Sequence, residues 1–164
     1  MVTHGPCTAK SAVQICYPPK KKENMLQRVT MIDMVRTYIR QDPVRPHIPA
    51  ESRIALGREM YHIDEQAFIC LAFVDRVPVS EVEVFGSQVG NIAVAYTVWS
   101  LKKGLGRKII TETQKRIQDT FRFKRLVTFS PKTEMAKNFH LSNGATLLQE
   151  SPHAYNFEYN IEQF

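Results

Sequence analysis

A basic segment with two glycines, in the middle of the chain, has residue types that suit the binding of phosphate groups. It contains seven consecutive residues, Lys102, Lys103, Gly104, Leu105, Gly106, Arg107 and Lys108. The glycines would let the backbone approach a pyrophosphate without a Cβ in the way, and the four cations would surround it with positive charge. The alternative is an ordinary helix start whose basic residues are only solvated.

The elements on either side of this segment would aim it at a ligand. Residues 91–99 are dense in β-branched and aromatic types and predict a central strand, and a stripe of apolar positions predicts a helix over 105–120. A strand that runs through a short glycine loop into a helix directs unpaired backbone N–H groups and the positive helix end at one point. We expect an anion to bind there.

A second motif lies further along the chain, at Ala136-Lys137-Asn138-Phe139-His140-Leu141-Ser142-Asn143-Gly144-Ala145. Together with Lys102–Gly106, it resembles the two signatures of the GCN5-related N-acetyltransferases. These are Arg/Gln-x-x-Gly-x-Gly/Ala, which binds pyrophosphate, and Ala-x-x-Phe-Tyr-x-x-x-Gly-Phe. The order of the two motifs, with a helix and the strand 126–130 between them, also matches that family. The resemblance covers residues 91–150 in motif and nearly the whole chain in architecture.

The resemblance implies a fold, a cofactor and a set of contacts. It implies one α/β (α+β) domain over 1–164, with a central mixed, mostly antiparallel sheet of six to seven strands and about four helices. Acetyl-CoA would lie with its pantetheine arm along the backbone of Tyr96 and Val98 and its pyrophosphate at 102–108. Phe139 would face the arm, and Thr133 stands where the family often has an asparagine that hydrogen-bonds the cofactor.

Three positions depart from the signatures, namely Leu101 for Arg/Gln, His140 for Tyr and Ala145 for the closing Phe. The family's tyrosine often protonates the leaving thiolate, and His140 could take that role as an imidazolium. The alternative is a helix histidine without a catalytic part. Glu83, on a strand predicted over 79–85, is the candidate general base for an incoming amine; alternatively it belongs to the polar side of that strand.

The remaining segments predict the elements that complete the domain. Their spacing predicts strands over 11–17, 67–74, 79–85, 126–130, 145–149 and 155–161, and helices over 24–41, 50–61 and 133–142. The apolar run 67–74 and the segment 79–85, joined by a turn, predict an antiparallel pair. Asn143 and Gly144 predict the end of the last helix.

Composition narrows the function classes. With 164 residues and 43% hydrophobic composition, the chain can form one globular domain. No apolar run reaches the roughly 18 residues of a membrane span and no secretory signal is evident, so we expect a cytoplasmic protein. The spacing of Cys7, Cys16 and Cys70 predicts neither a disulfide framework nor a metal site. The net charge of +6 would attract a phosphorylated cofactor, an acidic protein or RNA.

Three functions follow from these features. The first is an N-acetyltransferase that moves an acetyl group from acetyl-CoA to an amine of a protein, a small molecule or an aminoacyl-RNA, by direct attack in a ternary complex. The second is a catalytically degenerate acetyltransferase-like domain with a binding or structural role, as in some bacteriophage virions. A basic nucleic-acid-binding domain is least favoured, because the cations are not interleaved with aromatic residues.

Overall fold

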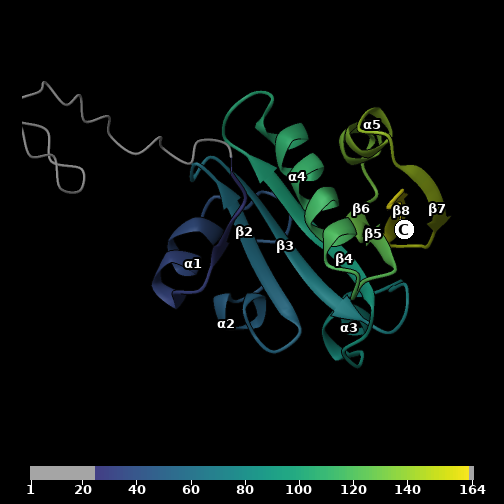
Figure 1. Ribbon diagram of the computed structural model, residues 1–164, viewed down its shortest axis with the longest axis horizontal. Coiled ribbons are helices and arrows are strands. Elements are labelled where there is room, and N and C mark those ends of the chain that lie inside the picture. Colours follow the sequence, from purple (N-terminus) through teal and green to yellow (C-terminus); the bar gives the residue numbers. More distant parts are fainter. Residues whose placement is uncertain (1–24, 163–164) are drawn as a thin grey trace, which may run out of the picture.

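The computed structural model describes residues 25–162, which form a mixed α/β fold (Figure 1). Its strands are β1 (Gln27–Val29), β2 (Arg58–Ile63), β3 (Ala67–Val74), β4 (Ile92–Ser100), β5 (Arg125–Thr128), β6 (Ser130–Pro131), β7 (Thr146–Glu150) and β8 (Ala154–Tyr159). Its helices are α1 (Ile32–Ile39), α2 (Ala50–Arg53), α3 (Glu81–Gly86), α4 (Leu105–Asp119) and α5 (Glu134–Ser142). The predicted fold class is confirmed, with one more strand and one more helix than expected in the described chain.

The strands form a single sheet in the order β1-β2-β3-β4-β5-β8-β6, and β7 also pairs with β8. Only β4 and β5 are parallel among the described pairs; the other neighbours are antiparallel. A parallel pair needs a crossover connection, which α4 supplies. β8 lies between β5 and β6 although it follows both of them in the sequence.

Strand β3 shows how the sheet is covered on both faces. Each of its residues is buried, and successive side chains alternate between two hydrophobic cores. Phe68 belongs to the core that α1, α2 and α3 cover. Ile69 belongs to the opposite core, which α4 and α5 cover. The nearly continuous apolar run in the sequence is therefore a strand buried on both sides.

The segment predicted as one helix over 24–41 is divided in the structure. Its beginning forms β1, and α1 starts only at Ile32. Val29 pairs with Met60 of β2 and is buried, so sheet pairing overrides the helical spacing here. The strand predicted over 11–17 lies outside the described residues.

Segment 79–85 forms helix α3, so its prediction as a strand was wrong. Ser80 Oγ accepts a hydrogen bond from the Glu83 N–H, and the Glu83 carboxylate accepts one from the Val79 N–H. This is a variant of the capping box that starts helices. β3 consequently pairs with β4 instead. The helix predicted over 50–61 ends early, because Gly57 has a φ of +75° and the next residue begins β2.

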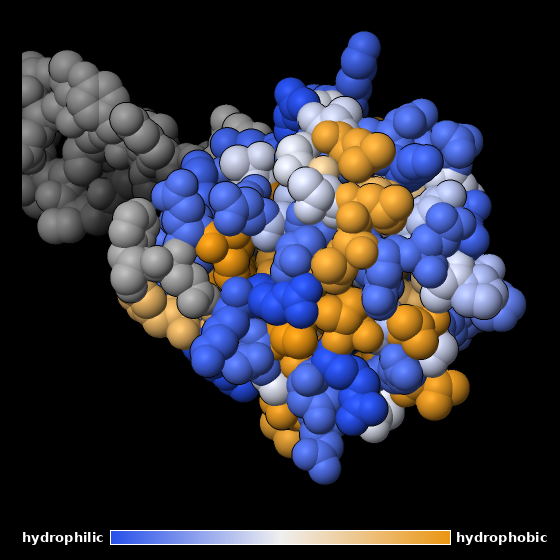
Figure 2. Space-filling model, turned by 90° about the vertical axis from the view of Figure 1, so that its right-hand side faces the viewer, coloured by the Kyte–Doolittle hydropathy of each residue, from blue (hydrophilic) through white to orange (hydrophobic). Residues whose placement is uncertain are grey.

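Strand β7 is exposed along its whole length and lies beside α5 (Figure 1). Figure 2 shows this side of the molecule, on which apolar groups lie between polar ones. The exposed apolar side chains of α5 and β7 are Met135, Leu141, Leu147 and Leu148. None of the described helices is both long and apolar enough to cross a membrane.

Candidate functional site

Strands β4 and β5 separate halfway along β4, and the site lies in this opening. They pair only from Ile92 to Ala95, against the four residues of β5. The last bond between them runs from the Phe129 N–H to the Ala95 carbonyl at 2.9 Å. Beyond it, the rest of β4 pairs with no other described strand on that side. Its backbone groups there are available to a ligand.

A β-bulge on β4 decides which backbone groups face the opening. The register with β3 shifts between Cys70 and Leu71, which leaves Tyr96 as the extra residue. After the bulge, the Leu101 N–H points away from the opening, toward β3. It donates at 2.7 Å to the backbone carbonyl of the residue just before β3. Because backbone groups alternate along a strand, the N–H and carbonyl of Val98 face the opening.

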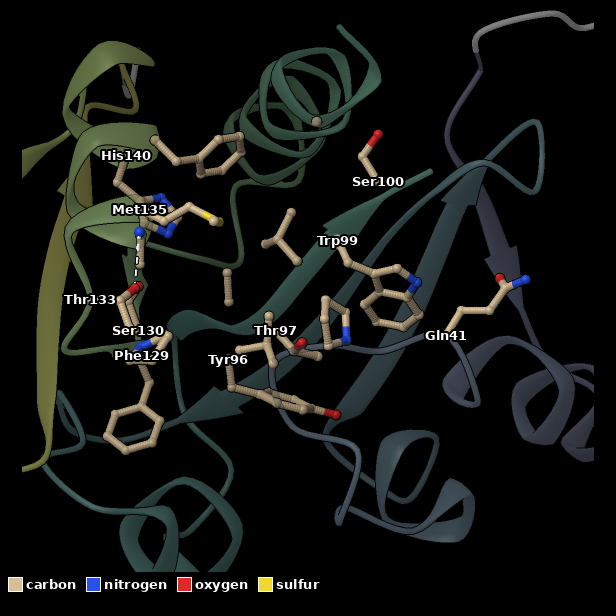
Figure 3. Close-up of a pocket in the computed structure, with 18 of the residues that line it drawn as sticks. Gln41, Tyr96, Thr97, Trp99, Ser100, Phe129, Ser130, Thr133, Met135 and His140 are labelled. Carbon is tan, nitrogen blue, oxygen red and sulfur yellow. Dashed lines mark hydrogen bonds between the residues drawn. The ribbon is translucent and has the colours of Figure 1, made fainter. Parts of the chain in front are cut away.

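The opening leads into a cavity of about 540 Å³ with a mostly apolar lining. In Figure 3, Trp99 and Gln41 lie on one side of this cavity, and Met135, Thr133 and His140 lie on the other. The lining is drawn from the loop after α1, from β4, from the start of α4, from the segment between β5 and α5, and from α5 itself. The site is therefore assembled from segments far apart in the sequence.

A second hollow, of about 470 Å³, adjoins the cavity at the start of α4. Gly104 caps the helix with a φ of +88°, a conformation that other residues rarely adopt. Within the described chain, the amides of Gly104, Gly106 and Arg107 have no hydrogen-bond acceptor, whereas those of Leu105 and Lys108 are used within the turn. Free amides at the positive end of a helix are suited to an anion.

The basic side chains of this segment have different surroundings. Lys102 and Lys103 are exposed and line the hollow. Arg107 instead donates to the end of α5, at 2.8 and 3.0 Å, and ties the two helices together. The Lys108 ammonium forms an ion pair, at 3.5 Å, with a glutamate one turn further along α4. Leu105 packs against the core under α4. Of the predicted phosphate contacts, the two lysines and the glycine backbone are best placed.

Helix α5 brings three predicted site residues to the cavity. Thr133 caps the helix, where its Oγ1 accepts a hydrogen bond at 3.1 Å from the N–H three residues on. The Phe139 ring lies so close to α4 that a Cβ on Gly106 would come within 3.2 Å of it. Gly106 therefore permits both the close approach of the helices and access to the backbone.

His140 lines the cavity as a buried, neutral ring. It is 5% exposed, its Nδ1 lies 2.7 Å from the Tyr159 hydroxyl, and it stacks on Phe157. Burial lowers the pKa of His140 to about 4 and raises the pKa of Tyr159. The imidazolium that a role of His140 as proton donor would require is thus not the form favoured at neutral pH.

Glu83 lies away from the cavity, in the first turn of α3, where its carboxylate serves as a helix cap. Its neighbour Glu81 accepts hydrogen bonds from Arg45 at 2.8 Å and from His47 at 2.9 Å. Burial opposes the ionisation of Glu81, but His47 and Arg45 hold its pKa below the usual value. The carboxylates of this segment are therefore engaged in a helix cap and an ion pair.

The loop after α1 contains residues that shape the cavity and that sequence reasoning missed. Asp42 and Arg53 form an ion pair at 2.8 Å, and neither side chain has exposed surface. Asp42 also accepts bonds from the N–H of Val44 at 2.8 Å, the N–H of Arg45 at 3.0 Å and the hydroxyl of Thr97 at 3.1 Å. These bonds fix the loop against β4 and place its apolar residues at the cavity. The sequence around Asp42 is a proline-rich loop, and nothing in it indicates that this carboxylate pairs with residues far along the chain.

No protein-family model and no curated protein matches the sequence. Solved structures do match the architecture. The loading GNATL domain of CurA from Lyngbya majuscula gives a TM-score of 0.62 at 14% identity, over 83% of this chain and 96% of that one. AAC(6')-Ib, solved in complex with ribostamycin and coenzyme A, gives 0.60 at 8% identity, over 82% and 91%. The chain has the fold of the GCN5-related N-acetyltransferases.

Malonyl-CoA decarboxylase from Agrobacterium vitis also contains this architecture, with a TM-score of 0.57 at 18% identity. That match covers 78% of this chain but only 38% of the decarboxylase, so the chain spans less than two fifths of that protein's length.

Within the GCN5-related fold, the two signature segments of this chain lie next to each other around the cavity. The three departures have distinct surroundings. Leu101 is exposed at the hollow beside α4, and His140 is buried at the cavity wall. Ala145 is buried in the core under α4 and α5, so its small side chain affects packing rather than ligand contact.

Proposed function

We propose that the protein binds acetyl-CoA between β4 and the start of α4 and transfers its acetyl group to an amine. The observation that carries this proposal is the continuity of two spaces, both lined by Gly106 and Phe139. Free helix amides line one space, and the unpaired edge of β4 lines the other. The pyrophosphate would bind the amides beside Lys102 and Lys103, and the pantetheine arm would lie along β4 and bond Val98.

In the proposed reaction, the acceptor nitrogen attacks the thioester carbonyl carbon. A C–N bond forms, the C–S bond breaks, and the proton lost by nitrogen reaches the leaving sulfur. The Val98 N–H would donate to the carbonyl oxygen as it gains negative charge. The Tyr159 hydroxyl would donate to Nδ1 of His140, which leaves a proton on Nε2 for a hydrogen bond to the sulfur. Holding both reactants in one cavity contributes much of the acceleration.

Trp99 allows a direct test of binding, because it is the single tryptophan of the chain and lines the cavity. Titration with acetyl-CoA should change its fluorescence and raise the melting temperature. At a hundredfold excess over the dissociation constant, the stabilisation should be about 2.7 kcal/mol. If neither signal changes, the proposed cofactor site is wrong, and a binding or structural role of a degenerate domain becomes the better hypothesis.

Release of free thiol measures the reaction itself. Peptide N-termini, lysine side chains and small amines are suitable acceptors for a first panel, with acetyl-CoA alone as the control. Thiol release that depends on the amine supports acetyl transfer. Cofactor binding without amine-dependent release from this panel supports the degenerate role instead.

A second candidate is decarboxylation of malonyl-CoA, which the mostly apolar lining of the cavity favours. A site that excludes water promotes loss of CO₂ from a carboxylate. The bond between the carboxylate carbon and the α-carbon would break, the electron pair would pass to the thioester enolate, and the α-carbon would then take up a proton from solvent water. CO₂ release from malonyl-CoA without an amine would identify this reaction, and no release would exclude it.

A further inference from the structure

Arg45 occupies the point at which β4 and β5 separate. Its Nε donates to the Tyr96 carbonyl at 2.8 Å, and its Nη2 donates to the Phe129 carbonyl at 3.1 Å. The guanidinium also lies over the Phe129 ring, 4.4 Å from its centroid, and the side chain is only 10% exposed. One side chain thus joins both sides of the opening where backbone pairing ends.

The bulge on β4 explains why these two carbonyls need a side-chain donor. In a continuous parallel ladder, the Phe129 carbonyl would accept an N–H from β4. The extra residue Tyr96 turns the following part of β4, so that Thr97 pairs with β3 instead. Buried carbonyl groups are nearly always paired, and Arg45 supplies the two missing donors.

The position of Arg45 is itself fixed by several contacts. Its Nη1 bonds Glu81 at 2.8 Å, its N–H donates to Asp42, and its carbonyl accepts from Arg53 at 2.7 Å. Asp42 also accepts the Thr97 hydroxyl. The loop therefore holds two successive residues of β4, at the bulge itself.

We propose that Arg45 is a positioning residue that maintains the bulge and so keeps the Val98 N–H directed into the cavity. Without the bulge, the alternation along β4 would shift by one residue, and Thr97 rather than Val98 would face the opening. The inference rests on the proposed function, in which Val98 donates to the bound acyl group. Arg45 acts through this backbone and does not line the cavity.

Kinetics of Arg45→Met and Arg45→Lys test the proposal, with Arg58→Met as the matched control. Arg58 also donates to two backbone carbonyls, at 2.6 and 3.1 Å, and lies over the ring of Phe85, but it bonds neither β4 nor Phe129 and does not line the cavity. Arg45→Met should lower kcat about tenfold to a hundredfold. KM for acetyl-CoA should change by less than about threefold, because the contacts at α4 remain. Arg45→Lys should recover part of kcat, and Arg58→Met should leave it within about twofold.

Amide hydrogen exchange gives a readout that needs no turnover. Acetyl-CoA, added without an acceptor amine, should slow exchange at Val98 and Gly106 in the unsubstituted protein. In Arg45→Met, the protection at Val98 should disappear while that at Gly106 remains. If Arg45→Met does not fold, Arg45→Lys is compared in the same way, with weaker loss at Val98 expected.

The outcomes separate this inference from the proposed function. If acetyl-CoA protects neither amide in the unsubstituted protein, the cofactor site is wrong and the inference falls with it. If it protects both, but the Arg45 variants keep the protection at Val98 and the original kcat, the role of Arg45 is refuted and the cofactor site stands. Equal kinetic losses in the Arg45 and Arg58 variants would also refute it, since they would reflect general destabilisation.

Discussion

Replacing Asp42 by Asn measures what the buried ion pair contributes to stability. The substitution preserves shape but removes the negative charge beside Arg53, whose side chain has no exposed surface. Arg53 would keep its bonds to the carbonyls of Ile48 at 3.1 Å and Arg45 at 2.7 Å. Its charge would nevertheless remain buried without a counterion, which is the situation that proteins avoid most strongly.

The expected magnitude follows from this complete burial. Removing one partner of a buried pair costs about 3–5 kcal/mol. In a chain of 164 residues, each kcal/mol shifts the melting temperature by about 2–4 °C, so Asp42→Asn should lower it by about 6–20 °C. Arg53→Met should cost a similar amount, because it removes the ion-pair partner of the buried Asp42 carboxylate. The double variant should lose less than the sum of the two single losses, because neither charge then remains alone.

Thermal unfolding followed by circular dichroism tests these values. The control is Glu51→Gln, which breaks the exposed pair between Glu51 and Arg36. That pair has nearly the same distance, 2.7 Å, but its side chains are 64% and 52% exposed. Its loss should cost no more than about 1 kcal/mol. Additive losses in the double variant, or an Asp42→Asn effect as small as the control, would refute the reasoning from burial.

Two further predictions concern α4 and α5. Gly106→Val should abolish acetyl-CoA binding, measured by Trp99 fluorescence, because the new side chain would meet the Phe139 ring and cover the free amides; Gly86→Val, where a Cβ meets nothing within 4 Å, should bind normally. The pKa of His140 is about 4 in the folded protein against 6.5 ordinarily, so the unfolded chain takes up this proton first as the pH falls. About 3 kcal/mol of the free energy of unfolding should therefore be lost between pH 6.5 and 4, measured by urea unfolding. This loss should be largely absent in His140→Gln. If His140→Gln shows the same pH dependence as the unsubstituted protein, the buried neutral ring is contradicted.

The joint between β4 and α4 could be predicted from the sequence because its signals are local. A β-branched strand, two glycines and a helical stripe follow one another within a short segment, and the structure confirms each of them. The end of α5 at Asn143 and Gly144 was predicted for the same reason, and Gly144 has a φ of +93°. The architecture implied by the two signature motifs is likewise confirmed.

Helix α3 shows how an alternating pattern misleads. Val82 and Val84 opposite Glu81 and Glu83 fit a strand, but the spacing Ser80-x-x-Glu83 is also the signal of a helix cap. The structure contains the cap, so the capping residues rather than the alternation determine the local conformation.

Arg45 could not be found from the sequence for a different reason. Its partners on the two strands are backbone carbonyls, at Tyr96 and Phe129, and any residue type at those positions would present the same group. Only the bulge and the end of strand pairing create the need for a donor. These are properties of the assembled sheet rather than of a segment.

The position of β8 between β5 and β6 constrains how the protein is made. Buried Asn156 on β8 donates to the carbonyls of Thr128 at 2.8 Å and Pro78 at 2.9 Å, so this late strand holds together segments synthesised long before it. While the nascent chain still lacks β8, the segment that carries Phe129 and Ser130 has no partner on its outer side. The cavity beside this segment is therefore completed only after β8 has left the ribosome.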